Sequence, residues 1–222
     1  MSTLLLTLLP LALGAAVSPT LLMVEVFALS ASTSPIIKGW LVALGATAAL
    51  IVYAALGLLA GSALPHSHPH HAIDAAIDLT AAVLLGWLII HQLSSRGAAS
   101  SKPSLAQRLD AASGRTFFIA GFVMMVTNFS TIILFMPAIR IITKAQVALS
   151  GRGLALILVM LIALLPVLAP VSVVTILGDR ASVALAKLND VVTRRSLAIT
   201  ITLEAIFCAF FLIKGITELT AS

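Results

Sequence analysis

Long apolar runs separated by shorter polar connections dominate the pattern of this chain. A transmembrane helix needs about 20 consecutive apolar residues. Six stretches meet this requirement, and they are Leu4–Ser30, Gly39–Ala60, Asp74–Leu93, Thr116–Thr143, Gly153–Leu177 and Ser196–Thr217. The first and the fourth stretch are long enough to be tilted or broken. The pattern therefore predicts an all-α integral membrane protein with six transmembrane helices.

Composition supports the same fold class and excludes several functions. The chain is 60% hydrophobic and 9% charged, whereas soluble domains carry about 25% charged residues. The net charge of +5 is therefore interpreted through membrane topology, and no nucleic-acid partner is expected. The sequence contains no Gly-rich phosphate loop and no Ser/His/Asp set that its spacing would support. We therefore expect neither an enzyme nor a bound cofactor.

The chain divides into two similar halves. A polar stretch at 96–115, which could hold a short interfacial helix, separates a first half at 1–95 from a second at 116–222. In these halves "LALGAAVSPTLLMVEVF" corresponds to "FIAGFVMMVTNFSTIILF". Each half has three predicted helices, and a repeat with an odd number of helices must be inverted in the membrane. Inverted repeats with broken helices at matching positions are typical of secondary transporters.

The matching breaks fall at Ser18-Pro19 and Asn128-Phe129. Proline removes one helical hydrogen bond, and lipid offers no replacement for the freed backbone group. We expect local unwinding, with carbonyl groups and half-helix N-termini facing a cavity. The alternative is a simple kink whose backbone groups are satisfied by neighbouring helices. The expected lining of the cavity is Ser18, Pro19, Thr20, Asn128, Ser130 and Thr131.

Two carboxyl groups lie inside predicted membrane segments. Glu204 is near the centre of the last segment, where a charged carboxylate costs on the order of 2.5–3.5 kcal/mol on insertion scales. It is interpreted as a proton relay or a ligand of substrate or cation, with a structural, paired carboxyl as the alternative. Glu25 follows Pro19 in the first segment. It could pair with Glu204 or with a basic residue such as Arg140.

Two prolines in the fifth segment, Pro166 and Pro170, are four residues apart and so lie on one helical face. They are expected to bend this helix, either as a hinge for alternating access or as a static kink.

The connection after the second segment is rich in histidine. Imidazoles at such spacing can bind zinc, nickel or cobalt, but a Pro-containing loop without cysteine is a poor preformed site. The candidate metal ligands are His66, His68, His70, His71 and Asp74.

Lys and Arg are concentrated in the connections after the first, third and fifth segments. The positive-inside rule then predicts that both termini and the histidine-rich loop lie outside.

Three stretches carry a resemblance to a known family. They are "LLPLALGAAVSPTLLMVEVFALS", "GFVMMVTNFSTIILFMPAIRIITKA" and "LPVLAPVSVVTILGDRASVALAKLNDVVTRRSLAITI". Together they resemble the glycopeptidolipid- or sulfolipid-addressing (GAP, or Sap-like) proteins of actinobacteria, which belong to the lysine-exporter (LysE) superfamily. This resemblance implies two inverted three-helix repeats and a role in moving lipids or their precursors to the cell surface. Here Asn128-Phe129-Ser130-Thr131 stands where the family usually has Asn-Pro-Lys-Asn, so no role of that lysine is carried over.

The residues and the resemblance together predict a secondary transporter or export accessory of the plasma membrane. Its substrate would be a lipid, a glycolipid or a precursor, and coupling to protons would run through Glu204 and Glu25. The alternative is efflux of divalent metal ions or small solutes through the histidine-rich loop and the intramembrane carboxyls. A membrane scaffold for lipid-synthesis enzymes is a third hypothesis. Membrane lipids, a second copy of the chain or a lipid-synthesis or export protein are the expected partners.

Overall fold

The computed structural model describes residues 2–16, 18–31, 33–63, 71–94 and 113–178, and then 198, 201–202, 204–213, 215–217 and 220. All regular secondary structure in these residues is helical, as predicted. The helices are α1 (Ser2–Ala16), α2 (Pro19–Leu29), α3 (Pro35–Ala63), α4 (His71–Ser94), α6 (Gly114–Val126), α7 (Phe129–Lys144), α8 (Leu149–Ala163) and α9 (Leu165–Leu177). After α9, all of the described residues between 201 and 217 are helical as well.

Three of the predicted segments are pairs of shorter helices with a sharp bend between them. The angle is 60° between α1 and α2, 67° between α6 and α7, and 71° between α8 and α9. The predicted breaks in the first and fourth segments are therefore confirmed. The fifth segment bends just before Pro166, which has no N–H to donate to the Ile162 carbonyl of the preceding turn. In contrast, α3 has no internal proline and runs unbroken for 29 residues.

The number of membrane spans follows from these lengths. Among the described residues, α3 alone is long and apolar enough to cross a membrane, and there are up to four spans if each bent pair forms one. The apolar part of α4 at Leu79–His91 is shorter. Six spans are thus not established by length and composition.

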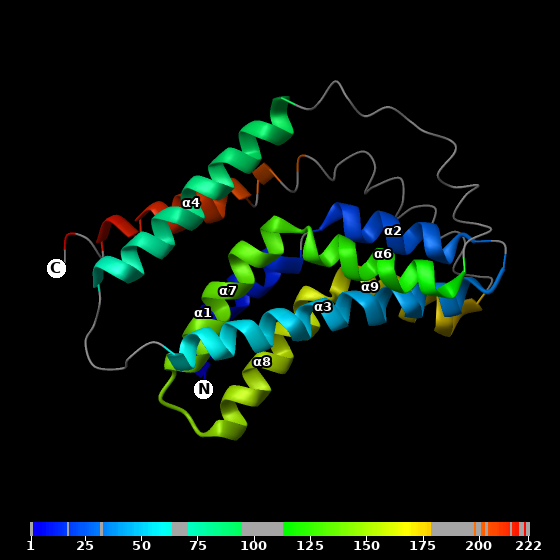
Figure 1. Ribbon diagram of the computed structural model, residues 1–222, viewed down its shortest axis with the longest axis horizontal. Coiled ribbons are helices and arrows are strands. Elements are labelled where there is room, and N and C mark those ends of the chain that lie inside the picture. The colour runs from blue at the N-terminus through cyan, green and yellow to red at the C-terminus, as the bar shows by residue number, and fades with distance from the viewer. Residues whose placement is uncertain are drawn as a thin grey trace.

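The half-helices form two groups that lie beside each other (Figure 1). One group contains α1, α7 and α8, while in the other α2 packs against α6 and α9. The long α3 runs past both groups and packs most extensively on α6. The first half of one broken segment thus packs beside the second half of the other, so the two broken segments run in opposite directions.

Glycines allow α3 and α6 to approach closely. A Cβ atom on Gly45 would overlap the carbonyl oxygen of Phe118, and one on Gly121 would overlap that of Val42. Small residues at helix crossings let backbones touch and are a common basis of helix association in membranes. The contact between these two helices is therefore a contact of backbones.

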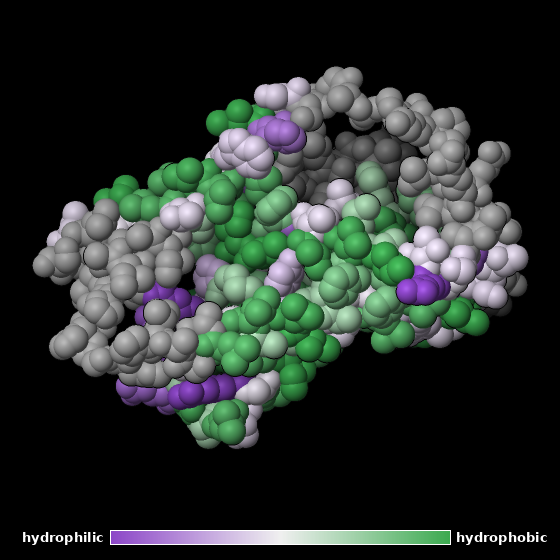
Figure 2. Space-filling view, viewed as in Figure 1, coloured by the Kyte–Doolittle hydropathy of each residue, from purple (hydrophilic) through white to green (hydrophobic). Residues whose placement is uncertain are grey.

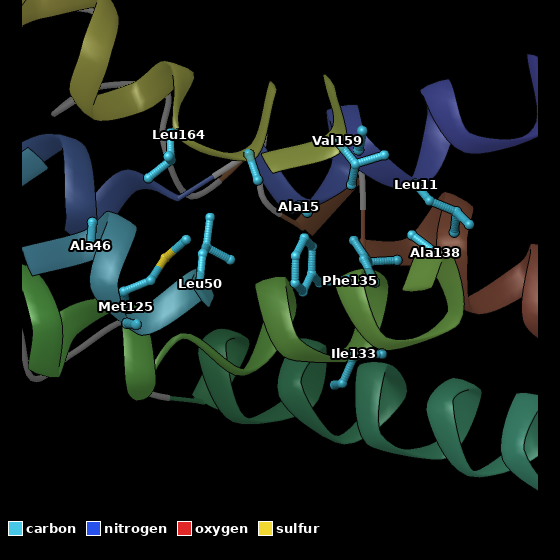
Figure 3. Close-up of a cluster of buried hydrophobic side chains, with 14 of the residues drawn as sticks. Leu11, Ala15, Ala46, Leu50, Met125, Ile133, Phe135, Ala138, Val159 and Leu164 are labelled. Carbon is cyan, nitrogen blue, oxygen red and sulfur yellow. The ribbon is translucent and has the colours of Figure 1, made fainter. Parts of the chain in front are cut away.

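One apolar core joins the two predicted halves of the chain. Its buried side chains come from α1, α3 and α4 as well as α6, α7 and α8. In Figure 3 the fully buried ring of Phe135 lies between Leu50 of α3 and Ala138 of its own helix, with Ala15 of α1 close by. The final helical stretch also joins this core, because the ring of Phe207 lies against Gly14. The same stretch runs beside α4 (Figure 1), where the Cys208 thiol donates to the Ala82 carbonyl at 3.3 Å.

The outer surface is as apolar as the core. Leu149, Ile176 and Leu6 are 83%, 80% and 70% exposed, and Figure 2 shows hydrophobic residues over most of the coloured surface. Soluble monomers rarely expose apolar patches of more than a few hundred Å². In a bilayer the same surface meets lipid tails at no cost. The chain is a membrane protein.

Candidate substrate and coupling site

The break in the first segment is built from local capping chemistry. α1 ends at Ala16, and the side chain of Ser18 accepts a hydrogen bond from the backbone N–H of Leu21 at 3.4 Å. Serine is a favoured N-cap because its hydroxyl satisfies an N–H of the first helical turn. Pro19 is the first residue of α2, a position where its missing N–H has no helical partner to lose. Ser18 and Pro19 thus start a new helix.

The break in the second half has the same construction. α6 ends at Val126, and Asn128 is the N-cap of α7. Its side-chain oxygen accepts a hydrogen bond from the backbone N–H of Thr131 at 3.4 Å. Asn128 and Ser18 therefore have equivalent roles, each capping the second half-helix through the residue three positions later. The correspondence predicted from the sequence holds at the level of individual hydrogen bonds.

The two breaks are joined directly. In an unbroken helix the Ala15 carbonyl would accept from the N–H of residue 19, but residue 19 is proline. The hydroxyl of Thr131 supplies the missing donor instead, at 3.0 Å from the Ala15 oxygen, and Thr131 is buried. A residue in the second half of the chain thus satisfies the backbone group that Pro19 leaves unpaired in the first.

A side chain also satisfies the carbonyl at the end of α6. The Tyr53 hydroxyl of α3 donates to the Val126 oxygen at 2.7 Å. Other helices therefore supply donors to the carbonyls of Ala15 and Val126, as in the alternative of a kink whose backbone groups are satisfied by neighbouring helices. Broken helices are tolerated at membrane depth when neighbouring side chains satisfy the backbone in this way.

Glu204 lies at the second break. It is 3% exposed, and its Oε1 accepts a hydrogen bond from the Ser130 hydroxyl at 2.7 Å. Ser130 is the second residue of α7, so the carboxyl group sits near the positive end of the α7 dipole. The structure therefore brings Glu204 together with Ser130, and through α7 with Thr131 and the first break.

Of the remaining predicted residues, Thr20 lies at the first break and Glu25 lies away from both breaks. Thr20 is exposed, and its hydroxyl oxygen is 3.5 Å from that of Ser18. Glu25 is fully buried and packs against the beginning of α3 rather than at the breaks. It has no hydrogen bond to any described residue. The suggested pairing of Glu25 with Glu204 or Arg140 is therefore not formed.

The structure describes the predicted hinge prolines but not the side chains of the predicted metal ligands. Pro166 is at the start of α9, directly after the bend, and Pro170 is buried inside α9. His66, His68 and His70 lie outside the described residues, as do the side chains of His71 and Asp74. Among the described residues no group of His, Cys, Asp or Glu could hold a metal ion.

A match to a known protein family shows which family this chain belongs to. A family described as "Sap, sulfolipid-1-addressing protein" matches residues 8–217. The chain belongs to the Sap family. Neither the curated proteins nor the solved structures contain a match. The family description names an addressing protein and not an enzyme, and the match covers both breaks and Glu204 of this Sap protein.

Two hydrogen bonds that complete the site are not predictable from the sequence. Nothing in it connects Tyr53 with the break in α6, and Thr131 is predicted as a site residue without its bond to Ala15. The missing N–H of Pro19 was a signal that Ala15 needs a donor from outside its helix. No feature of the sequence indicated which residue of this Sap protein provides it.

Proposed function

We propose that this Sap-family protein moves a lipid, a glycolipid or a precursor across the plasma membrane, as a secondary transporter or as an accessory of an export system. The family description supports a lipid cargo. The exposed apolar surface supports a site of action within the bilayer. In this proposal the partners are membrane lipids and the proteins that synthesise or receive the exported lipid.

The proposed architecture is six spans in two inverted repeats, as in the lysine-exporter superfamily, with both termini outside. Two observations support inversion. The breaks at Ser18 and Asn128 share one pattern of capping, and α1 packs on α7 while α2 packs on α6. Such crosswise packing is what two broken segments of opposite direction produce.

The proposed path of the substrate passes the two breaks. Polar groups of the breaks would contact the polar part of the lipid, and its tails would remain against the apolar surface. The residues proposed to line this path are Ser18, Pro19, Thr20, Asn128, Ser130 and Thr131.

Coupling to protons is assigned to Glu204 in this proposal. The observation that carries it is the 2.7 Å hydrogen bond from Ser130 to Glu204, because it ties an intramembrane carboxyl to a helix break. Intramembrane carboxyl groups commonly mark ion or proton pathways. Gain or loss of a proton on Glu204 changes this bond and so changes how the last segment is held to α7.

The test is a comparison of surface-extractable lipids from cells with and without the gene. The deletion strain is complemented with the parent, with Glu204→Gln, or with Thr202→Ala as a control at an exposed position of the same segment. Glutamine keeps an oxygen that can accept from Ser130 but cannot carry a proton. We expect the parent and the control to restore the missing lipid and Glu204→Gln to restore none of it.

Two other outcomes would contradict parts of the proposal. Unchanged surface lipids in the deletion strain would refute lipid export. Full restoration by Glu204→Gln would remove proton coupling through Glu204 and would favour a scaffold that acts by binding a partner protein.

A further inference from the structure

A second buried carboxyl, that of Glu25, lies away from the breaks. Its side chain is 0% exposed. A Cβ atom added to Gly39 of α3 would be 2.7 Å from Glu25 Oε1, 2.7 Å from Leu29 Cδ2 and 3.1 Å from Val171 Cγ2 of α9. The carboxyl group is therefore enclosed where α2, α3 and α9 meet, in space that exists because residue 39 has no side chain.

Among the described residues, this enclosure contains no group that would compensate a charge on Glu25. Neither carboxyl oxygen of Glu25 has a hydrogen bond to a described residue. Lys38 precedes Gly39, but its ammonium donates to Thr33 at 3.1 Å and lies 5.1 Å from the centre of the Phe117 ring. The one basic residue of α6, Arg115, is exposed, and α9 contains no titratable residue. A carboxylate in such surroundings is strongly unfavourable unless paired.

Two of the three helices that enclose Glu25 begin where a predicted membrane segment is broken or bent. α2 starts after the break at Ser18, and α9 starts after the bend at Leu164. Packed cores and helix interfaces change between discrete arrangements and do not deform continuously. Movement of α2 or α9 about these points would open the enclosure without unfolding α3.

We propose that Glu25 is a proton-binding site whose occupancy controls the packing of α2, α3 and α9. The protonated acid fits the closed arrangement. Release of the proton to solvent leaves a carboxylate that requires contact with water, so α2 and α9 separate. The biological role of this site rests on the proposed export function. The site is separate from Glu204, because Glu25 lies against α3 and α9 whereas Glu204 bonds Ser130 of α7.

The first measurement is infrared difference spectroscopy of the purified full chain in detergent, recorded between neutral and alkaline pH. The carbonyl stretching band of a protonated carboxylic acid reports the acid form directly. We expect a component of this band that is lost at alkaline pH, missing in Glu25→Gln and still present in Glu204→Gln. If the spectrum of Glu25→Gln retains the full band of the parent, the proton site at Glu25 is refuted.

The second measurement follows the opening itself and does not depend on the spectrum. A thiol is introduced by Val171→Cys in a Cys208→Ser background, and its reaction with a water-soluble reagent is followed against pH. Val159→Cys, at another fully buried position on α8, is the control. We expect reactivity of the Val171→Cys thiol to rise several-fold with pH, and the rise to vanish when Glu25→Gln is added. A rise that persists with Glu25→Gln, or no rise at all, would overturn the proposal.

Crowding the enclosure gives a third variant with a matched control. In Gly39→Ala the new methyl group would contact Oε1 of Glu25, whereas in Gly153→Ala it would meet nothing within 4 Å. We expect only Gly39→Ala to make the Val171→Cys thiol reactive at neutral pH. Equal reactivity in the two glycine variants would contradict the enclosure. The surface-lipid assay remains separate, because a protein with this proton site and no effect on lipids would refute export alone.

Discussion

The hydrogen bond that joins the two breaks leads to a quantitative prediction. Thr131→Val keeps the shape of the side chain but removes the hydroxyl that donates to the Ala15 carbonyl at 3.0 Å. Side-chain hydrogen bonds in membrane proteins contribute about 0.6 kcal/mol on average and up to about 1.7 kcal/mol. A buried acceptor left without any donor costs about 1–3 kcal/mol. Since Pro19 cannot supply a backbone donor to Ala15, we expect a loss of about 1–2 kcal/mol in the free energy of unfolding.

The chain contains a matched control for this substitution. The Thr47 hydroxyl also donates to a carbonyl, that of Ala43, but within the unbroken helix α3. That carbonyl lies four residues before Thr47 and keeps its normal backbone donor. Thr47→Val should therefore change the free energy of unfolding by less than about 0.5 kcal/mol, as expected for a donor that is not needed.

The assay is equilibrium unfolding of the purified protein in mixed micelles, followed by tryptophan fluorescence. Adding Pro19→Ala provides a further test, because it restores a backbone N–H at residue 19. This N–H can donate to the Ala15 carbonyl if the helix continues through the break. The effect of Thr131→Val should then become smaller, which a double-mutant cycle measures directly. Equal losses for Thr131→Val and Thr47→Val would refute the assignment of the Thr131 hydroxyl to the break.

Further predictions concern the other end of the break and the crossing of α3 and α6. Tyr53→Phe removes the donor to the Val126 carbonyl and should lower the free energy of unfolding by about 0.6 kcal/mol; an unchanged value would show that this carbonyl needs no side-chain donor. Gly121→Ala puts a methyl group into the backbone of α3 at Val42 and should cost about 1–3 kcal/mol by overpacking. Gly153→Ala meets open space and should stabilise by up to about 1 kcal/mol through helix propensity. Thermal unfolding of the two glycine variants in detergent measures both effects, and a stable Gly121→Ala protein would contradict the close crossing.

Local chemistry made much of the fold predictable. The apolar runs indicated the helices, because only a helix satisfies its own backbone in lipid. Ser18 with Pro19 and Asn128 with Phe129 indicated the breaks, because serine and asparagine cap helices and proline interrupts them. Pro166 indicated the bend of the fifth segment in the same way. Each of these conclusions depends on interactions within a few residues.

The amino-acid pattern is sufficient to predict an apolar helical membrane protein with two matching breaks and with two carboxyl groups in its apolar segments. The groups that these features contact follow from how the helices pack. Thr131 bonds Ala15 across 116 residues of sequence, and Ser130 bonds Glu204 across 74. The suggested partners of Glu25 were Glu204 and Arg140, whereas its carboxyl group lies enclosed against Gly39. Such contacts depend on how closely whole helices approach one another, and that distance is set by glycine crossings and bends along several segments at once rather than by any local pattern.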